Sequence, residues 1–175
     1  MKLKVLLVVT VLAIIAAACS GSAEEAGGGG AGGAQAGMPS MDMDMGQSEG
    51  STFGRPGDPD DADRTIEIVQ LDSFAFEPSE VEVAVGETVT FEVTNEGTAP
   101  HEFVLGDEMV QQGHESEMQE MGGELMPDED NAITVQPGET KSLTWTFMEA
   151  GTLRYGCHVI GHFAAGMVGT IDVMG

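Results

Sequence analysis

The chain has 175 residues, of which 30 are acidic and only six are Lys or Arg, so its formal net charge at pH 7 is −24. This charge argues against a nucleic-acid-binding protein, because such binding rests on cationic contacts to phosphate. It favours a soluble protein with basic partners and raises the local concentration of cations, although charge alone creates no binding site.

Residues 1–18 are predicted to be a secretory signal peptide of the lipoprotein type. Lys2 and Lys4 precede an apolar run over residues 5–18, and a positive start followed by apolar and small residues is typical of such signals. The run is shorter than the roughly 20 apolar residues of a membrane-spanning helix.

Three alanines followed by Cys19 resemble a bacterial lipobox. This resemblance implies lipidation of Cys19 and an exported protein anchored to the outer face of the cytoplasmic membrane, at the cell surface or in the periplasm. The alternative is ordinary cleavage in the same alanine-rich stretch.

Residues 19–63 are predicted to form a disordered tether. Six of the seven residues from 27 to 33 are glycine, and the segment holds too little apolar area to offset the entropy of ordering it. Four methionines lie between residues 38 and 45, interleaved with aspartates. Because thioether ligands select Cu(I), this stretch is either a transient copper-binding segment or compositional drift in a low-complexity tail, and both interpretations stay open.

Residues 64–175 are predicted to form one all-β domain. Short runs in which apolar and polar residues alternate follow one another, with turn residues between them, which is typical of an antiparallel sandwich or barrel. We therefore expect a Greek-key β-sandwich or barrel. The predicted strands cover residues 65–71, 81–85, 88–93, 101–105, 132–135, 143–147, 152–155 and 167–173.

The alternation stops between residues 106 and 131, where the predicted domain carries an acidic insert rich in Met. On a helix, His114, Met118 and Met121 would lie on one face, and the glycine pair at 122–123 would end that helix. One interpretation is that this face packs over the sandwich and the methionines fill space. The other is that His114, Met118 and Met121 form a second, softer copper site or a lid over the first.

The segment from residue 157 to residue 167 carries the strongest chemical signal. Four residues separate Cys157 from His162, and four separate His162 from Met167. A trigonal set of two His and one Cys with a weak axial Met is the ligand set of a blue-copper site. The second histidine must then come from outside the loop, where His101 and His114 are the two candidates. His101 opens an alternating run after a proline, so a strand could bring it to the loop.

His158 and the two cysteines need separate interpretation. Neighbouring side chains of an extended segment point to opposite faces, so His158 is expected to face away from a metal bound by Cys157. It would then be a surface residue or a partner of a ligand. Cys19 lies at the start of the tether and Cys157 in the ligand loop. We expect no disulfide between them, although an exported protein meets an oxidising compartment.

These motifs resemble the cupredoxins, the type 1 blue-copper proteins. Residues 95–97 (Asn-Glu-Gly) followed by residues 100–103 (Pro-His-Glu-Phe) are similar to the strand that carries their first histidine, and the loop from 157 to 167 is similar to their ligand loop. The resemblance is closest to small bacterial members of the copper-tolerance and rusticyanin-like kinds, which carry a His- and Met-bearing insert. It implies one type 1 copper site with ligands at His101, Cys157, His162 and Met167.

Two functions share this expected site. One is one-electron transfer by a mononuclear type 1 copper protein with a redox partner protein. The other is copper tolerance, in which the protein sequesters copper outside the cytoplasmic membrane with extra Met and His sites and exchanges it with a copper donor or acceptor. In either case we expect a monomer.

An enzyme is not expected. A multicopper oxidase or copper nitrite reductase would need a second domain and more His ligands than four, and a binuclear copper centre would need a second Cys in the loop. A metal-free sandwich that binds a protein partner would leave the Cys, His and Met spacing unexplained.

Overall fold

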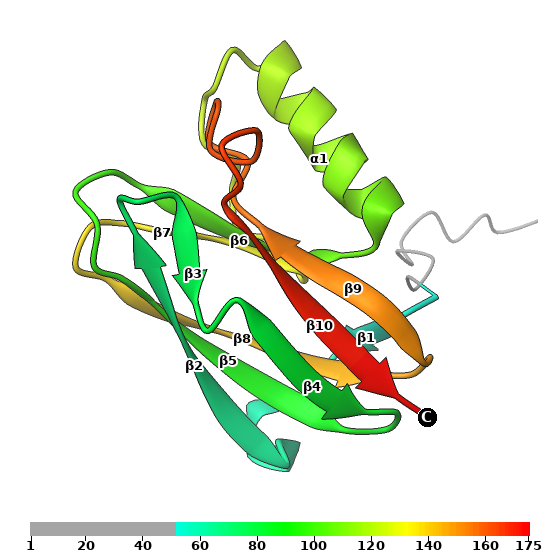
Figure 1. The fold of residues 1–175 in the computed structure, drawn as a ribbon. Coiled ribbons are helices and arrows are strands. Elements are labelled where there is room, and N and C mark those ends of the chain that lie inside the picture. The colour runs from blue at the N-terminus through cyan, green and yellow to red at the C-terminus, as the bar shows by residue number, and fades with distance from the viewer. Residues whose placement is uncertain (1–51) are drawn as a thin grey trace, which may run out of the picture. The chain divides into compact units, whose positions relative to one another are not determined.

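The computed structural model describes residues 52–175, which form two five-stranded β-sheets packed as a sandwich (Figure 1). This arrangement confirms the prediction of an all-β sandwich with an insert. The predicted signal peptide, Cys19 and the Met-rich stretch at 38–45 lie outside the described residues. No helix within the described part of the chain is long and apolar enough to cross a membrane.

The two sheets differ in the segments they bring together. The first sheet has the order β1 (Gly54–Pro56), β8 (Thr140–Phe147), β5 (Thr88–Asn95), β2 (Arg64–Leu71) and β3 (Ala75–Glu77). The second has the order β4 (Glu80–Ala84), β10 (Val168–Met174), β9 (Gly151–Gly156), β6 (His101–Gly106) and β7 (Ala132–Val135). The pairs β2–β5 and β4–β10 are parallel, and the other neighbours are antiparallel.

Most strands follow the period-2 pattern that predicted them. In β4 and β5, apolar residues that face the other sheet alternate with more exposed residues, because successive side chains of a strand point to opposite faces. The aromatic residues between the sheets pack against one another in edge-to-face, tilted and stacked pairs, among them Phe76, Phe91, Phe103 and Tyr155. β6 and β7 are the exceptions, since all of their residues are buried.

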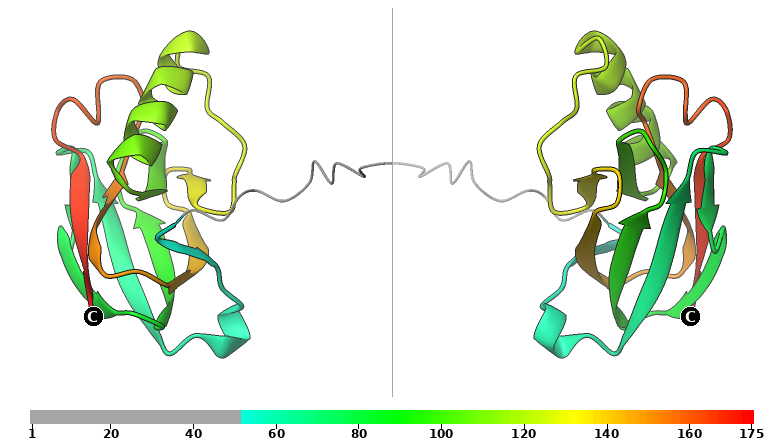
Figure 2. Two further views of the ribbon diagram at one scale, coloured as in Figure 1. Left: turned by 90° about the vertical axis from the view of Figure 1, so that its right-hand side faces the viewer. Right: turned by 90° about the vertical axis from the view of Figure 1, so that its left-hand side faces the viewer.

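The only α-helix of the described residues, α1 (Glu108–Glu120), explains the burial of β6. Asp107 caps the helix start, where its side chain accepts hydrogen bonds from two backbone N–H groups. Gly122 and Gly123 follow the helix end with φ angles of 67° and 83°, a conformation that glycine adopts readily. The helix lies outside the sheets, at the same end of the sandwich as the loop between β9 and β10 (Figure 2). It therefore covers the outer face of β6 close to that loop.

The ordered domain begins before residue 64, which corrects the predicted extent of the tether. β1 pairs with β8, and a short 3-10 helix, η1 (Pro59–Asp61), lies in the connection between β1 and β2. Phe53 is 5% exposed and its ring stacks on Trp145 with 5.3 Å between the ring centroids. The sequence around Phe53 shows no periodicity, because a three-residue edge strand is too short to carry one.

Candidate metal centre

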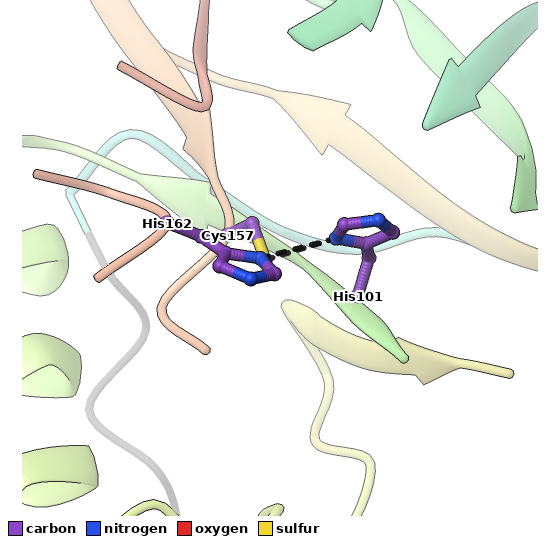
Figure 3. Close-up of side chains that lie close together, drawn as sticks. All are labelled: His101, Cys157 and His162. Atoms are coloured by element: carbon purple, nitrogen blue, oxygen red, sulfur yellow. Dashed lines mark hydrogen bonds between the residues drawn. The ribbon is translucent and has the colours of Figure 1, made fainter. Parts of the chain in front are cut away.

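Three metal-ligating atoms meet at the end of the second sheet (Figure 3). His101 Nδ1 lies 3.2 Å from His162 Nδ1 and 3.7 Å from Cys157 Sγ. Cys157 Sγ lies 3.4 Å from His162 Nδ1. The three side chains thus converge on one point, and His101, not His114, is the histidine outside the loop that joins the cluster.

The strand register brings the first two residues together. β6 and β9 pair antiparallel with Val104 opposite Gly156, so the start of β6 and the residue after β9 lie at the same end of the sheet. His101 is the first residue of β6, and Cys157 follows the last residue of β9. A ligand pair separated by 56 positions is therefore held by a backbone ladder rather than by a flexible loop.

The loop between β9 and β10 supplies the third ligating side chain, that of His162, and its two ends are hydrogen-bonded to each other. The His162 N–H donates to the Val159 carbonyl at 2.8 Å, and the Met167 N–H donates to the His162 carbonyl at 3.0 Å. The Cys157 N–H in turn donates to the Met167 carbonyl at 3.1 Å. These bonds fix the turn that carries His162 and bring the backbone of Met167 beside that of Cys157.

Cys157 is fully buried, and its sulfur accepts a hydrogen bond from the Glu102 N–H at 3.3 Å. Burial raises the pKa of the thiol to about 12, although the backbone N–H groups of Glu102 and Val159 act in the opposite direction. The thiol of the metal-free protein is therefore protonated at neutral pH. A metal ion must displace that proton to gain the thiolate as a ligand.

The two histidines are in the form that binds metals. Burial lowers the pKa of both His101 and His162, and for His101 the neighbouring His162 adds to this effect. Both rings are therefore neutral at pH 7, and a neutral imidazole nitrogen is the usual metal-ligating group. His101 Nε2 is buried, has no hydrogen-bond partner among residues 52–175, and lies 3.9 Å from Asp72 Oδ1.

The donor triangle fits a small metal ion. In a trigonal arrangement, bonds of about 2.0 Å to nitrogen and about 2.3 Å to sulfur, the lengths that zinc makes, would separate the donor atoms by roughly 3.5–3.7 Å. The observed separations of 3.2, 3.4 and 3.7 Å match this within a few tenths of an ångström. Thiolate and imidazole ligands suit copper and zinc, so the residues present fit copper.

Met167, the predicted axial ligand, is fully buried in the core of the sandwich. Its backbone bonds to Cys157 and His162 place it next to the donor triangle. A bond from its sulfur to a metal stays a prediction.

Asn95 is a positioning residue that residue chemistry alone did not identify. Its side-chain nitrogen donates to the carbonyls of Ala99 and Val135 at 2.8 and 2.9 Å, and its oxygen accepts from the Gly97 N–H at 2.8 Å. These bonds hold the segment that leads into His101. A Cβ atom at Gly97 would lie 2.5 Å from Asp72 Oδ1 and 3.0 Å from His101 Nε2, so a side chain there would push against the residues around the His101 ring. The Asn-x-Gly turn immediately before a strand was the signal available in the sequence.

His158 faces away from the donor triangle, as the alternation of side chains predicted. Its Nδ1 lies 2.9 Å from Glu115 Oε2, and its Nε2 lies 2.8 Å from Gln111 Oε1. Its ring also stacks on Phe163 with 4.4 Å between centroids. His158 is fully buried, so it connects the ligand loop to α1 instead of lying on the surface.

The predicted secondary set on α1 is divided in the structure. His114 and Met118 are buried against the sandwich, whereas Met121 is 45% exposed. Two side chains approach His114: the Oε1 of Glu102 in β6 lies 3.6 Å from His114 Nε2, and the His158 ring lies 5.1 Å from the His114 ring between centroids. Sequence reasoning did not single out Glu102, because a Glu in an alternating strand usually faces solvent.

Comparison with known proteins agrees with this geometry. Residues 64–174 match the family of copper-binding proteins described as the plastocyanin/azurin family. The chain is a cupredoxin.

Relatives of this cupredoxin include copper-resistance proteins. The copper-resistant cuproprotein CopI of Pseudomonas aeruginosa is 37% identical over 154 residues, which cover 72% of this chain and 84% of the relative. The protein of the same name from Rubrivivax gelatinosus is also 37% identical, over 80% of this chain and 81% of the relative. Among solved structures, dithionite-reduced auracyanin from Roseiflexus castenholzii superposes with a TM-score of 0.57 at 30% identity, covering 65% of this chain and 99% of auracyanin.

These findings confirm the predicted family and the prediction of a copper protein. Within residues 52–175 the structure brings together one His–Cys–His site. The family and the curated relatives are copper-binding proteins and not enzymes, as the sequence predicted.

Proposed function

We propose that this cupredoxin binds one copper ion in a type 1 site through His101, Cys157 and His162, with Met167 as the axial ligand. The observation that carries the proposal is the convergence of two imidazole nitrogens and one thiol sulfur within 3.2–3.7 Å of one another. Copper bound there would supply one-electron exchange between Cu(I) and Cu(II).

The chain's own residues suit this chemistry. The Glu102 N–H bonded to the Cys157 sulfur stabilises the thiolate form once the proton has left. His101 lies on a paired strand, and the backbone bonds of the loop hold His162. Side chains held by rigid elements keep one arrangement in both oxidation states of a metal, so little reorganisation would accompany electron exchange.

Copper tolerance is the physiological role that we favour over service as an electron carrier. The support is the 37% identity to two proteins named for copper resistance, over most of their lengths. The net charge of −24 adds to this, because it concentrates cations near the protein. We further propose that the protein is exported and anchored through Cys19, on the strength of the signal-like residues 1–18 and the lipobox resemblance.

Spectroscopy of the full chain tests the site. After addition of one equivalent of Cu(II), we expect an intense visible thiolate-to-copper band and one copper per chain. Cys157→Ser should abolish the band. Met167→Leu should keep the band but change its position and the reduction potential, whereas Met121→Leu, at an exposed Met, should change neither. A full chain that shows no thiolate band with Cu(II) would contradict the proposal.

Growth on copper tests the role. A strain that lacks the gene should be sensitive to copper, and the wild-type gene should restore tolerance where Cys157→Ser does not. Normal copper tolerance combined with a defect in respiratory or photosynthetic electron flow would instead support the role of an electron carrier.

A further inference from the structure

A second group of metal-ligating side chains lies between β6 and α1. Glu102 follows His101 in β6, so its side chain points to the opposite face of the sheet, where α1 covers it. There its Oε1 lies 3.6 Å from His114 Nε2, and the side chains of Glu102 and His114 are only 3% and 7% exposed. This pair is separate from the donor triangle, because no ligand atom is shared.

Both side chains carry a buried polar atom without a hydrogen-bond partner among the described residues. These atoms are Nε2 of His114 and Oε2 of Glu102, and leaving such atoms unpaired in a protein interior is costly. The 3.6 Å separation is too long for a hydrogen bond. A cation bound to both residues with bonds of about 2.0–2.2 Å in tetrahedral geometry would separate the donor atoms by roughly 3.4 Å. The pair is therefore spaced to hold an ion between its members.

Met126, whose side chain carries a thioether sulfur, lies beside Glu102 and His114. It lines, with Glu102, His114 and Thr134, a small hollow between the helix and the sheet. The Thr134 hydroxyl donates to the Met126 carbonyl at 3.3 Å, and the Thr134 N–H donates to Asp128 Oδ1 at 2.9 Å. The segment that carries Met126 is thus tied to β7 across the hollow.

We propose that Glu102 and His114 bind a second copper ion, with the thioether of Met126 as a further ligand. Imidazole and thioether are poor ligands for the hard ions Mg²⁺ and Ca²⁺, which prefer oxygen. Among divalent first-row ions, a nitrogen and oxygen site binds Cu(II) most tightly, and a thioether adds affinity for Cu(I). The site also lies in a strongly acidic protein, with a net charge of −24, which raises the local concentration of cations.

This site goes beyond the proposed function, since it is a second copper ion held by different ligands on the other face of β6. The two sites are nevertheless adjacent. The backbone N–H of Glu102 donates to Cys157 Sγ at 3.3 Å, while its side chain faces His114. A chain of this design would carry two copper ions within one domain.

Stepwise loading of the full chain with Cu(II), in competition with a weak chelator, tests the site. The first equivalent should give the thiolate band, and the second should give a distinct paramagnetic resonance signal with hyperfine coupling to one nitrogen. In His114→Phe the thiolate band should remain, while the dissociation constant for the second equivalent should rise at least about tenfold. Met109→Leu, at an exposed position of the same helix, should bind both equivalents as the wild type does.

The outcomes separate this site from the first one. Unchanged binding of the second equivalent by His114→Phe would overturn the proposal, and so would a wild-type chain that binds only one equivalent. Either result leaves the thiolate band, and with it the first site, intact. If His114→Phe loses the thiolate band through misfolding, His114→Gln is measured in its place, and retention of the one-nitrogen signal in that variant would overturn the proposal as well.

Discussion

Glu102 makes contacts on both faces of β6. Its backbone N–H donates to the Cys157 sulfur, and its carboxylate, buried under α1, faces His114. The residue beside it, His101, supplies one of the three donor atoms of the triangle. Two adjacent residues thus reach two different groups of metal-ligating side chains, because side chains alternate across a strand.

The buried thiol of Cys157 makes the metal-free protein sensitive to alkali. Burial raises the pKa of this thiol from 9.0 to about 12, so the folded state holds the proton more tightly than the unfolded state does. The stability contributed by this group is fully present below about pH 9 and is lost as the pH rises toward 12. The expected slope is about 1.4 kcal/mol per pH unit in this window.

Urea unfolding of the metal-free protein at pH 8.5 and pH 10.5 measures this effect. The wild type should lose on the order of 2 kcal/mol more than Cys157→Ser over that interval. The serine variant accounts for all other groups that titrate there. Equal losses in the two proteins would mean that the thiol does not titrate in this way.

At the scale of elements, α1 is tied to the ligand loop through its buried face. Gln111 is the centre of this contact. Its side-chain nitrogen donates to the carbonyls of Val104 and Arg154 at 2.9 and 3.2 Å, and its oxygen lies 2.8 Å from His158 Nε2. One side chain thus joins the helix to β6, to β9 and to the residue after Cys157.

Gln111→Leu should therefore destabilise the protein strongly. The change keeps the volume of the side chain but leaves its buried partners without hydrogen bonds, and we expect a loss of about 3 kcal/mol in the free energy of unfolding. Gln112→Leu is the matched control, because Gln112 is exposed and its side chain donates to the exposed side chain of Glu108. Chemical denaturation of both variants gives the comparison, and similar losses in the two would contradict the role assigned to Gln111.

At the scale of the whole domain, the sandwich is what holds the site together. The sheets bring together ligands from β6 and from the loop after β9, and the first sheet extends to residues that the sequence placed in the tether. Phe53 and β1 close the edge of that sheet against β8 and Trp145.

Phe53→Ala should destabilise the domain by about 3 kcal/mol, because it removes a buried aromatic ring from its contact with Trp145. Met148→Ala removes an exposed side chain and should cost much less. Thermal or chemical unfolding of the two variants in the full chain measures the difference. A negligible loss for Phe53→Ala would show that the stable domain begins at residue 64, as the sequence analysis expected.

Residue patterns predicted most of the strands and the ligand loop. Period-2 alternation is typical of strands, and eight of the ten strands were predicted from it, whereas β1 and β3, of three residues each, were not. Because Cys157, His162 and Met167 lie within one loop, their spacing along the chain limits how far apart they can lie in space. Two histidines outside the loop, His101 and His114, were candidates for the second imidazole ligand, and the resemblance to the cupredoxins favoured His101.

What lies on the second face of β6 depends on the packing of distant elements. Alternation cannot reveal that α1 folds back over Glu102, because a polar residue in an alternating run is expected to face solvent. The same holds for His158 and Phe53, whose partners Gln111 and Trp145 are far away in the sequence. Contacts between distant segments depend on how the elements pack, and local residue patterns carry no record of that packing.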